Sequence, residues 1–556
     1  MKRSTRQSGQ NHLRERVADA ESGQNHVRER VADSDSEWIL PTRRPLTSDY
    51  EAVRPSSLTR PTSAGLPASP PIPTPACVSK SSSANGSGTN RNVRPVSRAS
   101  KAAIPSPPTD QSTASPVPST KSKWNLKRGH ALAYAGVFLF TLVLYARPAE
   151  FYPSRVTASL ALIIALAPLA FFVPTQLSLE GTLTARPPEV NLVLLFCLTG
   201  LLSIPLAINP PIAWQEFSGT FIRCIVMFVV IVNVVRTRTR LKGLLFLALG
   251  ASLWLSVQAI SDYQQGLATV EGYRASGRGT GIFGNTNDMA LHVVTIFPIA
   301  IALLFGAKGL AGKIFYGVCA ALMLGGIVLS YSRGAFISLI VVAMFLAMRI
   351  GPRHRVGIVL ALLLLGGAVL LFAPDKYGGR LLSIFVPSLD PGGSSDARRG
   401  ELMRSLYLAI RHPLLGIGMG NYQPEMSYRG LVTHNSYTQV AAEMGAAALV
   451  CYTLFIVTPL RKLGQVARDT FEARGNSHYY YLAVGLQASL LAYMVSSFFL
   501  SVAYVWYVYY LVAFAVCLRR LYEAETRREV VVETRRERKQ KKVRAPFMST
   551  GRTVTT

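Results

Sequence analysis

Long apolar stretches separated by short basic loops predict an all-α, polytopic integral membrane protein with about twelve transmembrane helices. Hydrophobic residues make up 49% of the 556 residues, yet the formal net charge is +29. Both values fit this architecture, because a bilayer-spanning helix needs about 20 apolar residues and cytoplasmic loops collect Lys and Arg. The basic residues are scattered and form no single face, which argues against nucleic-acid binding.

The first 123 residues are predicted to form a tail. They are dominated by Ser, Pro, Thr, Arg and Gly and open with a tandem duplication, SGQNHLRERVADAE followed by SGQNHVRERVADSD. Such a composition cannot bury enough apolar surface to offset chain entropy. We predict disordered cytoplasmic tails over 1–123 and over the basic segment 519–556, with a polytopic membrane domain over 124–518.

The membrane domain contains twelve apolar runs of suitable length. The division between the last two is the least distinct. The predicted spans are 131–146, 156–173, 190–208, 217–235, 241–260, 288–305, 313–330, 336–348, 356–372, 438–457, 479–497 and 499–518.

The loops between these spans predict their orientation. RTRTRLK (236–242), GAKGLAGK (306–313) and RIGPRHR (349–355) are basic and fall on one side with both tails, whereas NPPIAWQE (209–216) lacks Lys and Arg. The positive-inside rule therefore puts both termini in the cytoplasm, and an even number of spans agrees. One large loop, 373–436, lies on the external side and is expected to contain short helices.

The polar motifs all fall on that external side. They include RPAEFYP (147–153), GYRASGRGTGIFGNTND (272–288), YSRG (331–334) and THNSY (433–437). Chemistry at this side has no direct access to ATP or nucleotide sugars, so a substrate must arrive already activated.

Arg333, in LSYSRGAFISL, lies at the outer membrane boundary. An arginine near hydrocarbon costs several kcal/mol unless it snorkels or pairs. Its planar guanidinium suits bidentate recognition of phosphate, and the alternative is an interface anchor that snorkels.

The external loop carries a dense group of arginines in DARRGELMRSLYLAIRHPLLGIGMGNY (396–422). We predict an amphipathic helix over Glu401–Arg411 with Leu402, Leu406 and Ile410 on one face, followed by a glycine-rich loop. The cluster indicates an anionic ligand, and a solvated basic face is the alternative reading. Its arginines are Arg398, Arg399, Arg404 and Arg411.

His434 is the external residue best suited to proton transfer, because an unperturbed imidazole has a pKa near 6.5. It precedes Asn435 and Tyr437 at the start of an apolar run. A histidine in this position can also serve only to hydrogen-bond a helix end.

The segment GRGTGIFGNTNDMAL (277–291) does not fit a phosphate-binding glycine-rich fingerprint. Asn285, Asn287 and Asp288 can cap the helix that follows, and the two amides can also contact sugar hydroxyls. The acidic residues are far apart in sequence and form no ligand spacing with histidine, so we expect no metal site.

The ordered set GIFGNTNDMAL, LSYSRGAFISL, ARRGELMRSLYLAIRHPLLGIGMGNY and THNSYTQVAAEMG resembles the O-antigen ligase and polymerase superfamily of bacterial inner-membrane glycosyltransferases. The resemblance spans roughly residues 130 to 520. It implies a multi-helix fold with a large periplasmic loop and transfer of a glycan from undecaprenyl pyrophosphate.

By this resemblance, Arg333 and Arg399 contact the pyrophosphate and His434 assists transfer, with the adjacent Arg398 as the alternative to Arg399. Because the donor is already activated, no nucleotide, metal or other cofactor is expected. The expected partners are the undecaprenyl-pyrophosphate-linked glycan, an acceptor glycan or lipid A core, and membrane lipids. The further residues expected to bind substrate are Arg398, Arg404, Arg278, Asn285, Asn287, Asn435 and Tyr437.

Two alternatives remain open at the level of sequence. A polymerase of the same superfamily would use the same donor with a growing lipid-linked chain as acceptor. A transporter of a small solute would place its polar site near the bilayer midplane, where Arg223 is the clearest charged residue within a span.

Overall fold

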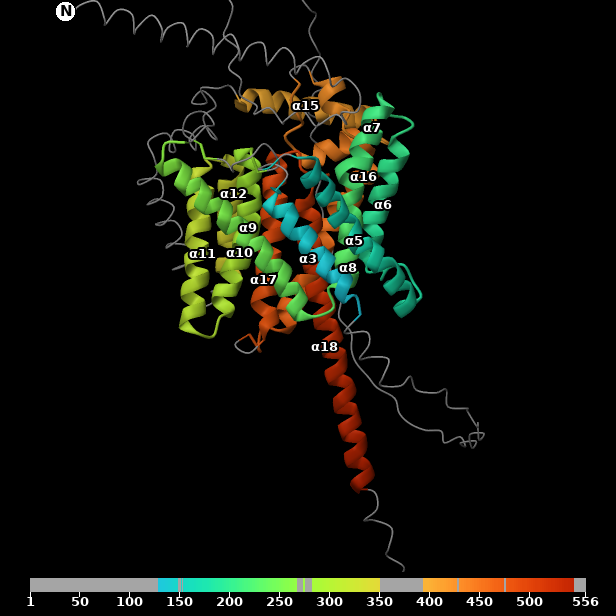
Figure 1. Ribbon diagram of the computed structural model, residues 1–556, viewed down its shortest axis with the longest axis vertical. Helices are drawn as coiled ribbons and strands as arrows, with labels where there is room; N and C mark the ends of the chain where they lie inside the picture. The colour runs from blue at the N-terminus through green and yellow to red at the C-terminus, as the bar shows by residue number, and fades with distance from the viewer. Residues whose placement is uncertain are drawn as a thin grey trace, which may run out of the picture. The chain divides into compact units, whose positions relative to one another are not determined.

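The computed structural model describes residues 129–148, 152, 154–267, 274–275, 283–350, 394–427, 430–474 and 477–544, and these residues form helices joined by turns (Figure 1). The predicted span 356–372 and the predicted disordered segment 1–123 lie outside the described residues. The helical elements are α3 (Ala131–Ala146), α5 (Arg155–Glu180), α6 (Pro188–Ser203), α7 (Pro210–Glu216), the π-helix η1 (Phe217–Phe221), α8 (Ile222–Val234), α9 (Arg238–Gln264), α10 (Thr286–Gly306), α11 (Leu310–Leu329), α12 (Arg333–Ile350), α15 (Ser394–Arg411), the π-helix η3 (Tyr422–Met426), α16 (Ser436–Asp469), α17 (His478–Ser496), the 3-10 helix η4 (Ser497–Phe499) and α18 (Trp506–Arg544).

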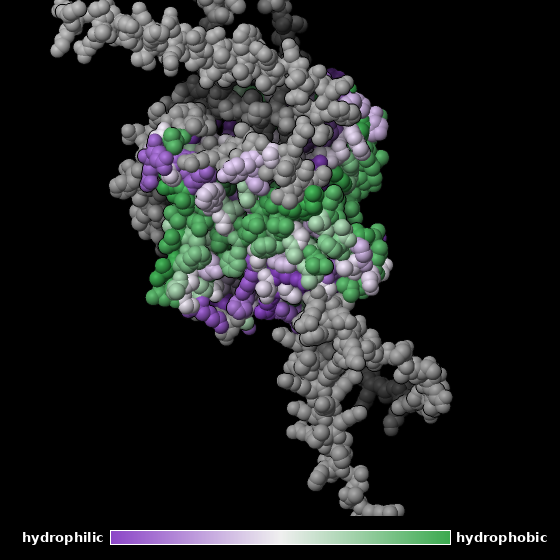
Figure 2. All heavy atoms as spheres, in the orientation of Figure 1, coloured by the Kyte–Doolittle hydropathy of each residue, from purple (hydrophilic) through white to green (hydrophobic). Residues whose placement is uncertain are grey.

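The predicted all-helical, polytopic membrane architecture is confirmed. Each predicted span that falls on described residues coincides with a helix, and the last two spans are separate helices, α17 and α18. Seven described helices are long and apolar enough to cross a membrane, while α3 and α6 are apolar but shorter. On the face shown in Figure 2, apolar residues form a band around the helices and hydrophilic residues lie at both ends.

Side chains that cap the helices explain where several of them begin. Asn209, Thr237, Asn285, Asn435 and Ser477 each accept a hydrogen bond from a backbone N–H of the first turn of the following helix. Such caps satisfy donors that have no partner within the helix itself.

The helix α18 differs from the predicted boundary near residue 518. It continues to Arg544, so most of the segment predicted as a disordered tail is helical. The sequence EAETRREVVVETRRERKQKK contains no Gly or Pro and is rich in residues of high helix propensity, which accounts for the extension.

The helix α16 is broken at Gly445, where φ is 85° and ψ is −179°. The glycine-rich segment 412–421 packs into this break. The backbone N–H groups of Ile417 and Gly418 donate to the carbonyl oxygens of Ala442 and Glu443, and the N–H of Ala446 donates to the carbonyl of Pro413. Buried backbone groups must find partners within the protein, and here the loop supplies them.

Replacing Gly445 with alanine should destabilise the protein by more than about 2 kcal/mol. A Cβ atom there would lie 2.3 Å from the carbonyl oxygen of Leu414, and the positive φ adds strain. Gly250→Ala, in α9, is the matched control because no atom lies within 4 Å of the added Cβ. Thermal unfolding of the detergent-solubilised protein should show a lower Tm for the first variant only, and equal Tm values would contradict this packing.

Candidate functional site at the polar end of the helices

Four segments that are far apart in sequence meet at one end of the helical body, the end that carries α15 in Figure 1. They form a small pocket, called the polar pocket below. Asn287 comes from α10, Ser332 from the joint before α12, and Arg398 from α15. Its remaining lining residues are Leu291, Gly334, Ala335, Ser496, Phe499 and Leu500.

Arg333 begins α12 beside this pocket. Its Nη1 atom donates a hydrogen bond of 2.9 Å to Oγ of Ser395 in the first turn of α15. Because Ser332 and Gly334 both line the polar pocket, the Arg333 position is adjacent to it in the chain. The arginine therefore links the α11–α12 joint to the helix that carries Arg398.

The register of α15 distinguishes Arg398 from Arg399. Arg398 is half-buried and lines the polar pocket, whereas Arg399 is exposed and is not among its lining residues. Successive residues of an α-helix point about 100° apart, so the two side chains leave α15 in different directions. The geometry therefore favours Arg398, the alternative left open by the sequence, over Arg399.

His434 lies in the turn before α16 and is 7% exposed. Its φ of 52° is left-handed, which is uncommon for a residue other than glycine. Hydrogen bonds hold the residues on both sides of it. Thr433 bonds to Ser501 at 2.7 Å, and the Ser436 hydroxyl donates to the carbonyl of Leu500 at 2.6 Å. The His434 turn is thus fixed against the segment that lines the polar pocket.

The charge of Arg398 reaches His434. Burial, together with this positive charge, lowers the pKa of His434 to about 3. The imidazole is therefore neutral at physiological pH and able to accept a proton.

The amides of the 285–287 segment have different roles. Asn285 accepts a hydrogen bond of 2.8 Å from the backbone N–H of Asn287, as expected of a cap. The Asn287 side chain instead lines the polar pocket and accepts a hydrogen bond of 2.9 Å from Nη2 of Arg274. Arg278 lies outside the described residues.

Three further residues predicted to bind substrate make contacts within the protein. Nη1 of Arg404 donates to the carbonyl of Met426 at 2.6 Å, and the Tyr437 hydroxyl donates to the carbonyl of Met494 at 3.1 Å. Asn435 accepts from the backbone N–H groups of Tyr437 and Thr438. These contacts hold the framework of the site, and their role toward a substrate stays a prediction.

No sequence motif singles out Arg274, which is 1% exposed. Besides its bond to Asn287, its Nε atom donates to the carbonyl of Ser330 at 3.1 Å. It therefore joins the start of α10 to the joint that precedes Arg333. Its place in the polar segment 272–288 was the only signal in the sequence.

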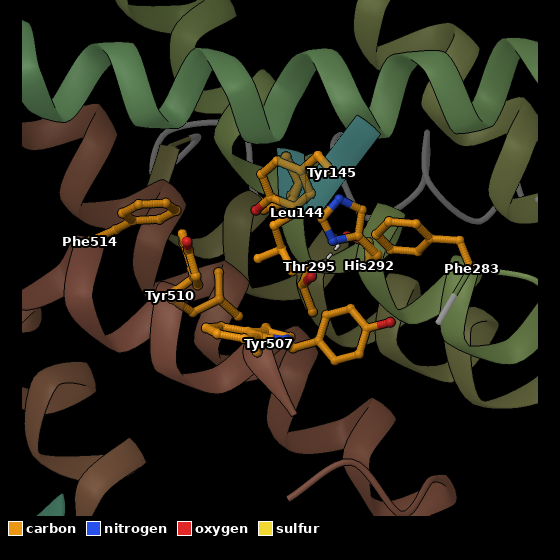
Figure 3. Close-up of a pocket in the computed structure, with 11 residues that line it drawn as sticks. Leu144, Tyr145, Phe283, His292, Thr295, Tyr507, Tyr510 and Phe514 are labelled. Carbon is orange, nitrogen blue, oxygen red and sulfur yellow. Dashed lines mark hydrogen bonds between the residues drawn. The ribbon is translucent and has the colours of Figure 1, made fainter. Parts of the chain in front are cut away.

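The opposite side of α10 faces a second cavity, between α3, α10 and α18 (Figure 3). His292 lies there among aromatic rings, with centroids 5.4 Å from Tyr145, 5.0 Å from Phe283 and 6.0 Å from Tyr507. The lining contains no Asp, Glu, Lys or Arg, so this cavity suits apolar groups and the polar pocket suits an anion.

Residues 318–453 match the family model of the O-antigen ligases. This match supports the resemblance to the O-antigen ligase superfamily. The matched O-antigen ligase region contains Arg333, Arg398 and His434, while Arg274 and Asn287 precede it. No curated protein matches the chain.

The lowered pKa of His434 predicts how the stability of this protein depends on pH. Its ordinary pKa is near 6.5, so the unfolded chain binds a proton that the folded protein excludes between about pH 6.5 and about pH 3. Stability should be complete above about pH 6.5 and should fall as the pH decreases through this window.

We expect the Tm of the wild type to fall more between about pH 7 and about pH 4.5 than that of His434→Asn, since asparagine tolerates the left-handed φ. His412→Asn, at an exposed position in the same region, should follow the wild type. An equal decrease of Tm in the wild type and in His434→Asn would show that protonation of His434 does not cause the loss of stability at low pH.

Proposed function

We propose that this membrane protein transfers a glycan from an undecaprenyl-pyrophosphate donor to an acceptor hydroxyl at the periplasmic face of the bacterial inner membrane. The observation that carries the proposal is that Arg398 lines the polar pocket, while Arg333 bonds to Ser395 of the same helix and the charge of Arg398 reaches His434. Two cations and a neutral imidazole suit a reaction in which a pyrophosphate leaves and a hydroxyl loses its proton.

The proposed orientation is supported by the charges at the other end of the helices. Ion pairs gather there, with Arg236 and Glu180 at 2.7 Å and Arg519 and Glu189 at 2.9 Å. This end also carries the basic loops of the sequence, and basic loops of membrane proteins face the cytoplasm. The polar pocket would then open to the periplasm, where a lipid-linked glycan presents its anomeric carbon near the membrane surface.

The donor supplies the driving force for the proposed step. The acceptor oxygen attacks the anomeric carbon, and the bond from that carbon to the phosphate oxygen breaks with its electron pair passing to the pyrophosphate. Arg398 and Arg333 stabilise the negative charge on this leaving group. The products are the new glycoside and undecaprenyl pyrophosphate. The reaction therefore balances without a nucleotide or a metal ion.

His434 accepts the proton of the acceptor hydroxyl in this scheme. The pKa of about 3 applies to the pocket without substrate, where the charge of Arg398 disfavours protonation. Burial is the larger cause of this low pKa, and a bound pyrophosphate would offset the smaller cause, the charge of Arg398, and so raise the pKa of His434. Binding of the donor would thus prepare the imidazole to take the proton.

Loss of Arg398, Arg333 or His434 should lower glycan transfer by at least about 100-fold, the effect typical of removing one group that stabilises transition-state charge. Arg399→Ala should retain transfer within about threefold, because Arg399 is exposed and does not line the pocket. Arg399→Ala is therefore the control matched in charge and position.

The measurement is conversion of undecaprenyl-pyrophosphate-linked glycan by membranes that contain each alanine variant at equal expression, with no added nucleotide or metal. Lipid A core and lipid-linked glycan should be offered separately as acceptors, which tells a ligase from a polymerase. Full transfer by Arg398→Ala or His434→Ala would reject the site. Accumulation of a solute with no transfer to either acceptor would favour a transporter.

A further inference from the structure

Three buried polar residues at the junction of α15 and α16 have no place in the proposed chemistry. They are Glu401, Tyr422 and Glu443, which are 6%, 1% and 2% exposed. Burying a carboxyl group costs free energy unless hydrogen bonds compensate, so their arrangement calls for an explanation.

Tyr422 connects the two carboxyl groups. Its backbone N–H donates to Oε1 of Glu443 in α16 at 3.2 Å. Its hydroxyl donates to Oε2 of Glu401 in α15 at 2.7 Å and also lies 2.9 Å from the Glu401 carbonyl oxygen. We call this set of contacts the Tyr422 bridge. Burial and the neighbouring Glu401 raise the pKa of Tyr422, so its hydroxyl keeps the proton that it donates.

The Tyr422 bridge contacts α15 on the helix face that carries Arg398. Residues three and seven positions apart share a helix face, which places Arg398, Glu401 and Ser405 on one side. Ser405 donates to the Thr438 hydroxyl of α16 at 2.9 Å. The sequence analysis predicted an apolar face of Leu402, Leu406 and Ile410, but Leu406 and Ile410 are exposed. The polar contacts of Glu401 and Ser405, together with the buried Leu408, therefore set how α15 is turned.

Glu443, at one end of the Tyr422 bridge, is itself held in place. Glu443 lies two residues before the break at Gly445, and its carbonyl accepts from Gly418 of the loop that fills the break. Tyr422 follows that loop directly in the chain. The anchored part of α16 thus determines where Tyr422 lies, and Tyr422 determines where Glu401 lies.

We propose that Tyr422 and Glu401 are positioning residues that hold Arg398 at the polar pocket and so determine the affinity for the pyrophosphate of the lipid donor. This inference rests on the proposed function. Without the Tyr422 hydroxyl, the buried Glu401 carboxylate would lose a strong donor and α15 would turn or tilt to hydrate it. Arg398, one helical turn away, would move with it.

The test measures binding of undecaprenyl pyrophosphate to the purified full-length protein, without transfer. Tyr422→Phe should weaken binding roughly tenfold, as expected for a lost hydrogen bond to a charged group. Tyr407→Phe, at an exposed tyrosine of α15, is the matched control and should bind as the wild type does. Glu401→Gln, which keeps an acceptor for the hydroxyl, should show a smaller effect and serves if Tyr422→Phe does not fold.

A double-mutant cycle tells positioning from a general loss of structure. In the Arg398→Ala background, Tyr422→Phe should cause no further loss of binding, because the group that it positions is already gone. A disulfide between Ser405→Cys and Thr438→Cys should restore binding to Tyr422→Phe when oxidised but not when reduced. Restored binding would show that the position of α15 is what the bridge supplies.

The outcomes separate the two proposals. Wild-type protein that does not bind undecaprenyl pyrophosphate, or Arg398→Ala that binds it equally well, would overturn the proposed function. Weakened binding by Arg398→Ala together with wild-type binding by Tyr422→Phe would overturn only the positioning role. Additive effects of the two substitutions would overturn it as well.

Discussion

The break in α16 at Gly445 is the constraint on which the rest of the site depends. A membrane-spanning helix cannot leave backbone N–H and C=O groups without partners, since no water is present in the hydrocarbon region to replace them. The segment 412–421 supplies those partners, which draws this loop into the helical body. Once the loop is fixed, the positions of Tyr422 and α15 follow, and with them the position of Arg398.

The left-handed glycines of this loop make the close approach possible. A Cβ atom on Gly416 would lie 2.3 Å from the carbonyl carbon of Glu443, so only glycine fits against the backbone of α16 there. A glycine-rich segment without a phosphate-binding fingerprint thus has a structural role. It lets one backbone pack directly on another, and the catalytic geometry proposed here is built on that contact.

The strength of charge interactions at the polar pocket depends on how deeply its residues are buried as well as on their charges. Arg274 is almost fully buried, Arg398 is half-buried, and His434 is close enough to feel the charge of Arg398. Charge interactions are stronger where water is excluded, so an anion that enters this pocket would gain more than at an open surface. The same exclusion of water lowers the pKa of His434 and keeps its imidazole neutral at physiological pH.

The sequence by itself determined the class of the protein, the helical spans in the described region and the segments that form the site, because apolar length, basic loops and helix caps are local properties. It also pointed to His434 and Arg333. Which of Arg398 and Arg399 faces the pocket, how α15 is turned and what Arg274 and Glu443 contact were decided only by the tertiary structure. Those features depend on a loop that fills a break in another helix, and no local pattern encodes contacts between residues so far apart in the chain.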